Sequence, residues 1–268
     1  KAFYFKGQRQ IIMSDLQIRY VAAVNNREVL EKNLIASSQI QGRVEERLHF
    51  VEGAQSISEA YNKGIDHWEG QADILVFAHQ DVYFPKGWEE KLLTEIKEFG
   101  NDWGIIGLVG VNYDSKTLGR SWSTGINTEI GADFRGVEKV RSVDEFVIVM
   151  NASKGVRFDQ NLPSFHLYGT DIVQQFNEKN VPSYIINAPV IYNGTVIKSL
   201  GGGYYDAYKY LQKKWRSELP LQTPCSRIEP FPYRYFKLRF KIAMRRVFED
   251  ISRPEIDPVE KAVALGYE

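Results

Sequence analysis

The chain has 268 residues, of which 43% are hydrophobic and 25% charged, values that are typical of one large globular domain with room for a small appendage. Its 34 basic and 34 acidic side chains balance, so no overall field selects nucleic acid as a partner. The one cysteine, Cys225, excludes an internal disulfide and fits a reducing compartment, and no apolar run of about 18 residues is long enough to span a membrane.

Strand and helix patterns alternate through the first 111 residues. Short apolar runs predict strands at 19–24, 48–51, 74–78 and 104–111. Apolar residues at helical spacing predict helices at 26–37, 56–68 and 88–99, and the second of these opens with Ser56 and Glu59, a capping-box pair. This alternation predicts an α/β fold with a mostly parallel central sheet and right-handed crossovers.

Polar side chains follow three of these strands directly. They are Asn25, Asn26, Glu52, His79, Gln80 and Asp81. Because ligands of such sheets bind at the carboxyl ends of the strands, we expect these side chains to converge on one edge.

The pattern changes after residue 111. Residues 112–141 are rich in Gly, Ser, Thr and Asp, which predicts loops and short antiparallel strands. Apolar runs predict buried strands at 145–153 and 183–190, and between them a polar, aromatic loop leads into a helix from about Thr170. A flexible loop at Gly201–Gly203 precedes an aromatic helix at 204–215.

The last 40 residues have a different composition. The stretch "YRYFKLRFKIAMRRVF" holds six basic residues between Arg234 and Arg246 and no acidic one. Its apolar residues fall near one helical face, so an amphipathic helix is predicted within 231–251. This helix could be a solvated face, could pack on a neighbouring domain, or could lie on an anionic membrane surface. No secretion signal is visible, so we expect a cytoplasmic protein, with peripheral attachment at the inner face of the membrane as one option.

Four stretches, in the same order, resemble the family 2 type of inverting nucleotide-sugar glycosyltransferases, which have the GT-A fold. They are "VAAVNN", "SISEAYNKGID", "ILVFAHQDVYFPKGW" and "FDQNLPSFHLYGTDIVQQF". The chain is most similar to a bacterial subgroup with His-Gln-Asp-Val in place of the usual Asp-x-Asp motif. The resemblance implies a Rossmann-like GT-A domain at 18–215, between an N-terminal extension at 1–17 and a basic, amphipathic helical extension at 216–268.

The resemblance also implies an activity. A sugar would move from a nucleotide-diphosphate donor to a glycan or lipid-linked glycan acceptor, with inversion, in bacterial surface polysaccharide synthesis. Hard oxygen ligands suit Mn²⁺ or Mg²⁺ beside a diphosphate, so Asp81 and His79 are the expected metal ligands. Donor contacts are expected from Asn25, Asn26, Glu52, Asn62, Lys63, His79 and Gln80.

Inverting transfer needs one general base, and the resemblance assigns this role to Asp171. The expected acceptor contacts are Trp122, His166 and Tyr168. Two positions depart from the family pattern: His79 replaces the first Asp of the metal motif, and Tyr192 or Asn193 stands where many members have a late metal-binding His.

Each of these residues could instead have a structural role. Asp81 could cap a turn, Asp171 could be a helix cap, and Lys63 could be a surface residue. A catalytically inactive GT-A domain that binds a glycan or a partner is the alternative function. A nucleotidyltransferase is a weaker rival, because "VNNREVL" has no glycine-rich loop after the first strand.

Overall fold

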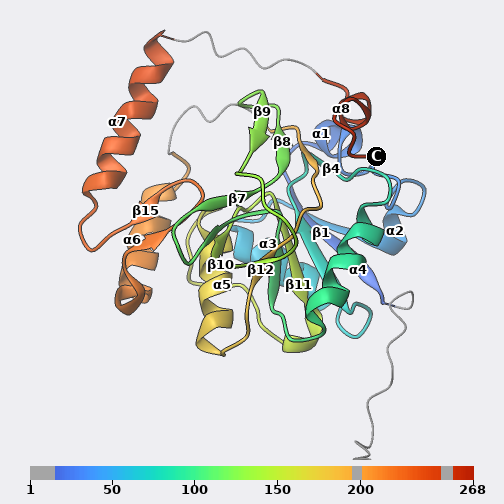
Figure 1. Cartoon of the computed structure of the whole chain (residues 1–268), viewed down its shortest axis with the longest axis horizontal. Helices are drawn as coiled ribbons and strands as arrows, with labels where there is room; N and C mark the ends of the chain where they lie inside the picture. Colours follow the sequence, from blue (N-terminus) through green and yellow to red (C-terminus); the bar gives the residue numbers. More distant parts are fainter. Residues whose placement is uncertain (1–15, 195–200, 249–255) are drawn as a thin grey trace, which may run out of the picture.

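The computed structural model of the chain describes residues 16–194, 201–248 and 256–268. A central sheet of nine described strands forms the middle layer of the molecule (Figure 1). Its strands are β1 (Ile18–Val24), β2 (Leu48–Glu52), β3 (Ile74–Ala78), β5 (Ile105–Gly107), β6 (Val109–Asn112), β7 (Thr117–Gly119), β10 (Glu138–Val143), β11 (Val147–Asn151) and β12 (Tyr184–Ile185).

The order of strands is β2-β1-β3-β11-β5-β12-β10-β6-β7. The pairings give β2, β1, β3, β5, β12 and β6 one direction, whereas β11, β10 and β7 run the opposite way. The predicted α/β class with a mostly parallel central sheet is therefore confirmed.

Helices cover both faces of this sheet. They are α1 (Arg27–Lys32), α2 (Val44–Arg47), α3 (Ile57–His67), α4 (Trp88–Phe99), α5 (Tyr168–Glu178) and α6 (Tyr204–Lys214), together with the short 3-10 helices η2 (Ala152–Lys154) and η3 (Arg216–Glu218). Strand β3 shows why both faces need cover. Leu75 and Phe77 belong to the apolar cluster that holds α3, α5 and α6, and alternate residues such as Val76 belong to the cluster that holds α4. A strand that is buried on both faces reads as a continuous apolar run.

Helix α3 lies close against β1. Ser56 caps it by accepting from the N–H of Glu59 (3.2 Å), and the Glu59 carboxylate accepts in return from the N–H of Gln55 (2.8 Å). A Cβ at Gly64 would lie 2.2 Å from a methyl of Val21, so only glycine allows this approach. The capping pair and this glycine together fix the position of the helix over the sheet.

A second sheet of four described strands lies beside the first, in the order β4-β13-β8-β9. Its strands are β4 (Val82–Tyr83), β8 (Ser121–Ser123), β9 (Thr128–Ile130) and β13 (Ile191–Tyr192). Two further strands, β14 (Leu221–Gln222) and β15 (Arg227–Ile228), form a hairpin after α6.

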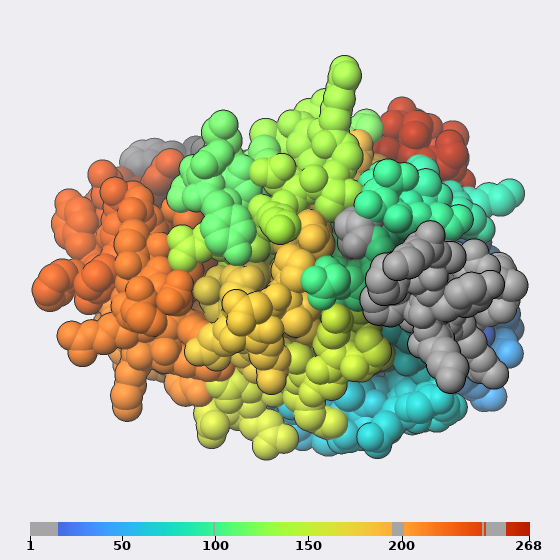
Figure 2. Space-filling model, turned by 60° about the horizontal axis from the view of Figure 1, so that its bottom comes forward, coloured from blue at the N-terminus to red at the C-terminus, as the bar shows by residue number. Residues whose placement is uncertain are grey.

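The C-terminal extension contains two helices with different settings. Helix α7 (Tyr233–Phe248) lies beside α6 at one side of the molecule, and α8 (Pro258–Ala264) lies on the opposite side (Figures 1 and 2). The end of the chain is bonded to the domain: the Tyr83 hydroxyl donates to Glu268 (2.7 Å), and Lys91 donates to the carbonyl of Tyr267 (2.7 Å). The predicted helix at 231–251 extends into 249–251, which lie outside the described residues, as does most of the expected N-terminal extension.

Several predicted elements are shorter or start elsewhere. Helix α1 ends at Lys32 rather than near Ser37, and Asn33 instead bonds the carbonyl of Val29 (2.8 Å). The strand expected at 183–190 contributes only β12 to the central sheet. Helix α5 begins at Tyr168, two residues before the expected start.

Candidate active site

A cavity of about 360 Å³ opens at the carboxyl ends of β1, β2 and β3. We call it the edge cavity. Its polar lining includes residues that were predicted for the site: Asn25, His79, Gln80, Asp81 and Tyr168. It also includes Tyr61, which was not predicted. The predicted convergence of polar side chains is therefore present at the ends of β1 and β3.

Gln80 joins the loop after β1 to the end of β3. Its side-chain oxygen accepts from the backbone N–H groups of Asn25 and Asn26 (3.0 Å each), and its amide nitrogen donates to the side-chain oxygen of Asn25 (2.6 Å). Asn26 also caps α1 by accepting from the N–H of Val29 (3.2 Å). The amides thus hold the rim of the edge cavity in a fixed shape.

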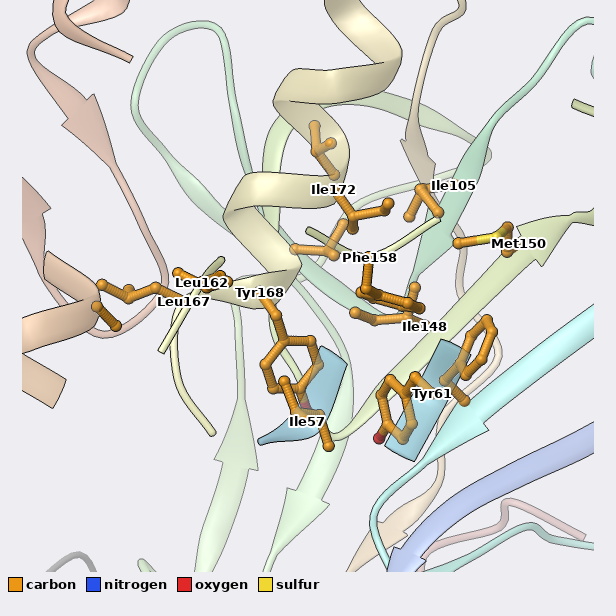
Figure 3. Close-up of a cluster of buried hydrophobic side chains, with 14 of the residues drawn as sticks. Ile57, Tyr61, Ile105, Ile148, Met150, Phe158, Leu162, Leu167, Tyr168 and Ile172 are labelled. Carbon is orange, nitrogen blue, oxygen red and sulfur yellow. The ribbon is translucent and has the colours of Figure 1, made fainter. Parts of the chain in front are cut away.

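His79 lies at the floor of the edge cavity, where its Nε2 is 2.7 Å from the Tyr168 hydroxyl. That hydroxyl donates its proton to the carbonyl of Glu145 (2.9 Å), so it accepts from His79, and Nδ1 of the neutral ring carries the lone pair. Burial lowers the pKa of His79, although the charges of Asp81 and Asp144 oppose this shift. Figure 3 shows Tyr168 with Ile57 and Tyr61 on one side of the buried cluster beneath α5.

Two acidic residues that the sequence interpretation missed lie near His79. Asp144 and Glu145 precede β11, which pairs antiparallel with β3, and the carbonyl of Phe146 accepts from the His79 N–H (3.0 Å). Glu145 is half-buried and accepts from the N–H of Gly169 at the start of α5 (3.2 Å). Burial, together with the negative charge of Asp144, raises the pKa of Glu145 to about 8.

The missed pair has a recognisable signal. Asp144 and Glu145 come directly before an apolar strand, "FVIVM". Only if that strand runs antiparallel does its first residue, rather than its last, lie at the ligand edge of the sheet. The sequence analysis predicted a buried strand at 145–153 but gave it no direction, so it did not place the start of this strand at the ligand edge.

Asp171 lies in a different environment, which we call the anchor cluster: Asp159, Asp171, Lys214 and Trp215. Its side chain is buried, its Oδ1 accepts from the Trp215 indole N–H (2.8 Å), and Lys214 lies 2.8 Å away. Lys214 also bonds Asp159 (2.6 Å). Burial raises the pKa of Asp171 despite the neighbouring ammonium group. Asp171 does not line the edge cavity, and its bonds join α5 to the end of α6.

Four of the expected donor-binding residues also lie outside the lining of the edge cavity: Asn26, whose side chain caps α1, and the three described next. Asn62 is buried in α3 and holds Phe158 through both its amide atoms, donating to the carbonyl (2.8 Å) and accepting from the N–H (3.0 Å). Lys63 forms an ion pair with Glu59 (2.7 Å) on the surface of α3. Glu52, at the end of β2, forms a two-bond ion pair with Arg27 (2.8 Å each). Their predicted contacts with a donor have no support from this placement.

The expected acceptor residues are separated. Tyr168 lines the edge cavity. His166 is not among the lining residues and packs against Tyr204 (ring centroids 5.3 Å apart), and burial and the charge of His79 lower its pKa. Trp122 is in the second sheet, where the ammonium of Lys261 from α8 lies 3.6 Å from the ring centroid. Its indole is used for packing of the C-terminal segment, so it does not line the edge cavity.

Few side chains are placed to bind a cation. Within 16–194, 201–248 and 256–268, no three His, Cys, Asp or Glu side chains are arranged to hold a metal ion. Asp81 and His79 are the candidate cation ligands among the residues that line the edge cavity. One or two protein ligands suit Mg²⁺ when phosphate oxygens and water complete its shell, so these residues fit a cation held jointly with a diphosphate.

A model of the glycosyltransferase-like family matches residues 20–215. The chain belongs to this family. The match contains all residues that line the edge cavity and all members of the anchor cluster, whereas α7 and α8 lie beyond it. No curated protein matches the chain.

Two solved glycosyltransferase structures resemble the chain at low identity. GalNAc-T7 with UDP, GalNAc and Mn²⁺ is 9% identical over 94% of this chain, with a TM-score of 0.47, and the chain spans 58% of that protein. The mannosyltransferase PcManGT from Pyrobaculum calidifontis, in complex with GDP-Man and Mn²⁺, is 10% identical over 94% of this chain and 79% of its own, with a TM-score of 0.46.

Proposed function

We propose that this member of the glycosyltransferase-like family transfers a sugar from a nucleotide-diphosphate sugar to a glycan or lipid-linked glycan acceptor, with inversion. The observation that carries the proposal is the edge cavity, which lies at the carboxyl ends of β1–β3 inside the family-matched residues. Cavities at this edge of α/β sheets are where nucleotides bind. Bacterial surface polysaccharide synthesis is the setting that the sequence resemblance supports.

The rim and floor of the edge cavity suit donor binding. Asn25 and Gln80 present amide groups that are already fixed by their mutual bonds, so little side-chain freedom is lost when a nucleotide binds. Phe165, at the mouth, is 41% exposed and offers a ring on which a base or a sugar could stack.

Asp81 and His79 would hold a divalent cation beside the diphosphate. Such a cation supplies charge stabilisation to the leaving diphosphate as the glycosidic bond breaks. The chain's own contribution is orientation: the Tyr168 hydroxyl fixes the ring of His79 so that Nδ1 presents its lone pair. Removal of this hydroxyl would leave the ring free to turn.

Two carboxyl groups compete for the role of general base. Asp171 is the residue that the sequence resemblance predicts, and to reach an acceptor it would have to exchange its bonds to Lys214 and Trp215. Glu145 is half-buried beside the His79–Tyr168 pair, and its pKa of about 8 suits proton transfer near neutral pH. Neither carboxyl group is among the residues that line the edge cavity, but Glu145 lies next to Tyr168, whose hydroxyl donates to the Glu145 carbonyl, so we infer that Glu145 acts as the base and that Asp171 anchors α6.

A cytoplasmic location is part of the proposal. In the described part of the chain, no helix combines the length and the apolar character needed to cross a bilayer. Attachment at the inner face of the membrane would bring the enzyme to a lipid-linked acceptor, and the surface of α7 that could provide it is treated below.

A thermal-shift screen of nucleotide sugars tests donor binding. A donor at 100 times its dissociation constant adds about 2.7 kcal/mol, which corresponds to roughly 5–10 °C for a chain of this size. The shift should appear in the presence of Mn²⁺ and disappear in Asp81→Asn, whereas Asp114→Asn, on an exposed turn far from this cavity in sequence, should respond like the wild type. A complete screen without any stabilising nucleotide or nucleotide sugar would overturn the proposal.

The alternative function is a catalytically inactive domain that binds a glycan or a partner. The observation that favours it is the full set of bonds on Asp171, the carboxylate expected to act as base. Detection of donor hydrolysis, or of transfer to any acceptor, would exclude it. Glycan binding without either reaction would support it.

A further inference from the structure

Helix α7 carries two distinct faces. Tyr235, Leu238 and Ile242 are spaced at helical period on the side toward the domain, and Tyr235 is buried against Tyr205 of α6 (ring centroids 4.8 Å apart). On another face Phe236, Phe240 and Met244 repeat every four residues, with exposed fractions of 48%, 67% and 41%. We call this exposed row the apolar stripe of α7. One face of the helix is thus fixed to the domain, while the described residues leave much of a second apolar face exposed.

Basic side chains border the apolar stripe on both sides. Lys237 and Lys241 follow Phe236 and Phe240 by one position each and lie along one edge, and Arg239 lies along the other. These three basic side chains are exposed. Two more aromatic side chains at the start of the helix, Phe231 and Tyr233, are 80% and 72% exposed. No acidic residue occurs within 233–248.

We propose that α7 binds an anionic lipid surface through its apolar stripe. Helices of this kind lie in the plane of the interface: aromatic and aliphatic side chains enter the headgroup boundary, and flanking Lys and Arg side chains keep their charges among anionic headgroups. Tyr235 and Phe236 both lie against Tyr205 of α6 (ring centroids 4.8 and 5.7 Å apart), whereas Phe240 and Met244 farther along the stripe are exposed. The catalytic domain would then be held at the membrane by one helix.

The charge pattern also argues against a second copy of this chain as the occupant. Stripe-to-stripe packing of two α7 helices would bring Lys237, Arg239 and Lys241 of both copies together, with no acidic residue in either helix to pair with them. An anionic lipid surface supplies the missing negative charge and an apolar layer at once.

Co-sedimentation of the full chain with vesicles tests the proposal. The wild type should sediment with vesicles of equal parts phosphatidylglycerol and phosphatidylcholine at low salt, and release at 0.5 M salt should be substantial because the attraction is screened. Phosphatidylcholine alone should bind weakly. A wild type that stays in solution with the anionic vesicles at low salt would overturn the proposal.

Two double variants separate the apolar and the electrostatic contributions to membrane binding. Phe236→Ser/Phe240→Ser and Lys237→Gln/Lys241→Gln should each lower the partition coefficient by about tenfold or more. Matched controls remove similar groups elsewhere: Ile126→Ser/Tyr113→Ser removes exposed apolar side chains, and Lys97→Gln/Lys139→Gln removes two exposed charges. Both controls should bind within twofold of the wild type.

Two further outcomes would contradict the proposal. Unchanged binding by both α7 variants would place the membrane contact elsewhere. A dimer in sedimentation velocity that the Phe236→Ser/Phe240→Ser variant abolishes would make a second copy the occupant. Nucleotide-sugar stabilisation of the same variants should match the wild type, so a failure of membrane binding and a failure of the proposed reaction can be told apart.

Discussion

Acidic side chains occur in two contrasting settings within the family-matched part of the chain. In the anchor cluster, Asp171 is 1% exposed and both of its oxygens are bonded to Lys214, Trp215 or Gln175. At the edge of the sheet, Asp81 lines an open cavity and Glu145 is half-buried with a raised pKa. Burial raises the pKa of both Asp171 and Glu145, but their partners differ: Asp171 is bonded to three side chains, whereas Glu145 accepts from the backbone N–H of Gly169. We therefore expect Asp171 to stabilise the fold and Asp81 and Glu145 to be suited to chemistry.

The largest effect is expected at Asp81. Asp81→Asn should weaken donor binding in Mn²⁺ and lower transfer by at least about a hundredfold, because the charge that holds a cation beside the diphosphate is lost. Isothermal titration with and without EDTA measures the binding part. Identical affinities for wild type and variant in both conditions would remove the metal role from Asp81 and would weaken the contrast drawn above.

Substitutions in the anchor cluster should affect stability more than the transfer rate. Asp171→Asn leaves Lys214 with one carboxylate instead of two and should lower the free energy of unfolding by about 1–3 kcal/mol. Urea denaturation provides the measurement, and Asp102→Asn, which removes an exposed partner of Lys154, is the matched control with a change within about 0.5 kcal/mol. A fully stable Asp171→Asn would show that these bonds contribute little to the fold.

Glu145 should have the opposite effect on stability. Because its pKa is about 8 in the folded chain and lower when unfolded, the unfolded chain loses this proton first as the pH rises, so the wild type loses stability between about pH 4.5 and pH 8. Glu145→Gln cannot ionise, and its stability relative to the wild type should therefore increase across this window. Thermal denaturation at pH 5 and pH 8 gives the comparison, and an equal difference at both values would contradict the raised pKa.

The sequence predicted the strand ends of the site better than its helix residues. The run 74–78 predicted a strand buried on both faces, and the polar residues after it do line a cavity. The capping pair at Ser56 and Glu59 correctly located the start of α3. Both are local signals, which depend on neighbouring residues in the chain.

The contacts that the sequence did not predict have a common physical cause. Asn62 and Trp122 were predicted to contact ligands, and in the structure they also contact residues 158 and 261, which are distant in sequence. The direction of β11, which brings Glu145 to the edge, likewise depends on the topology of the sheet. A pattern of neighbouring residues carries no record of such long-range partners.

The most direct test of the contrast between the two regions is the transfer rate of Glu145→Gln and Asp171→Asn, measured with a saturating donor at a temperature where both variants are folded. We predict that Glu145→Gln lowers the rate by about 10²–10⁴ with donor affinity within twofold of the wild type, whereas Asp171→Asn retains most of the wild-type rate. The reverse result, a large loss in Asp171→Asn and little change in Glu145→Gln, would show that the anchor cluster opens during catalysis and would contradict the account.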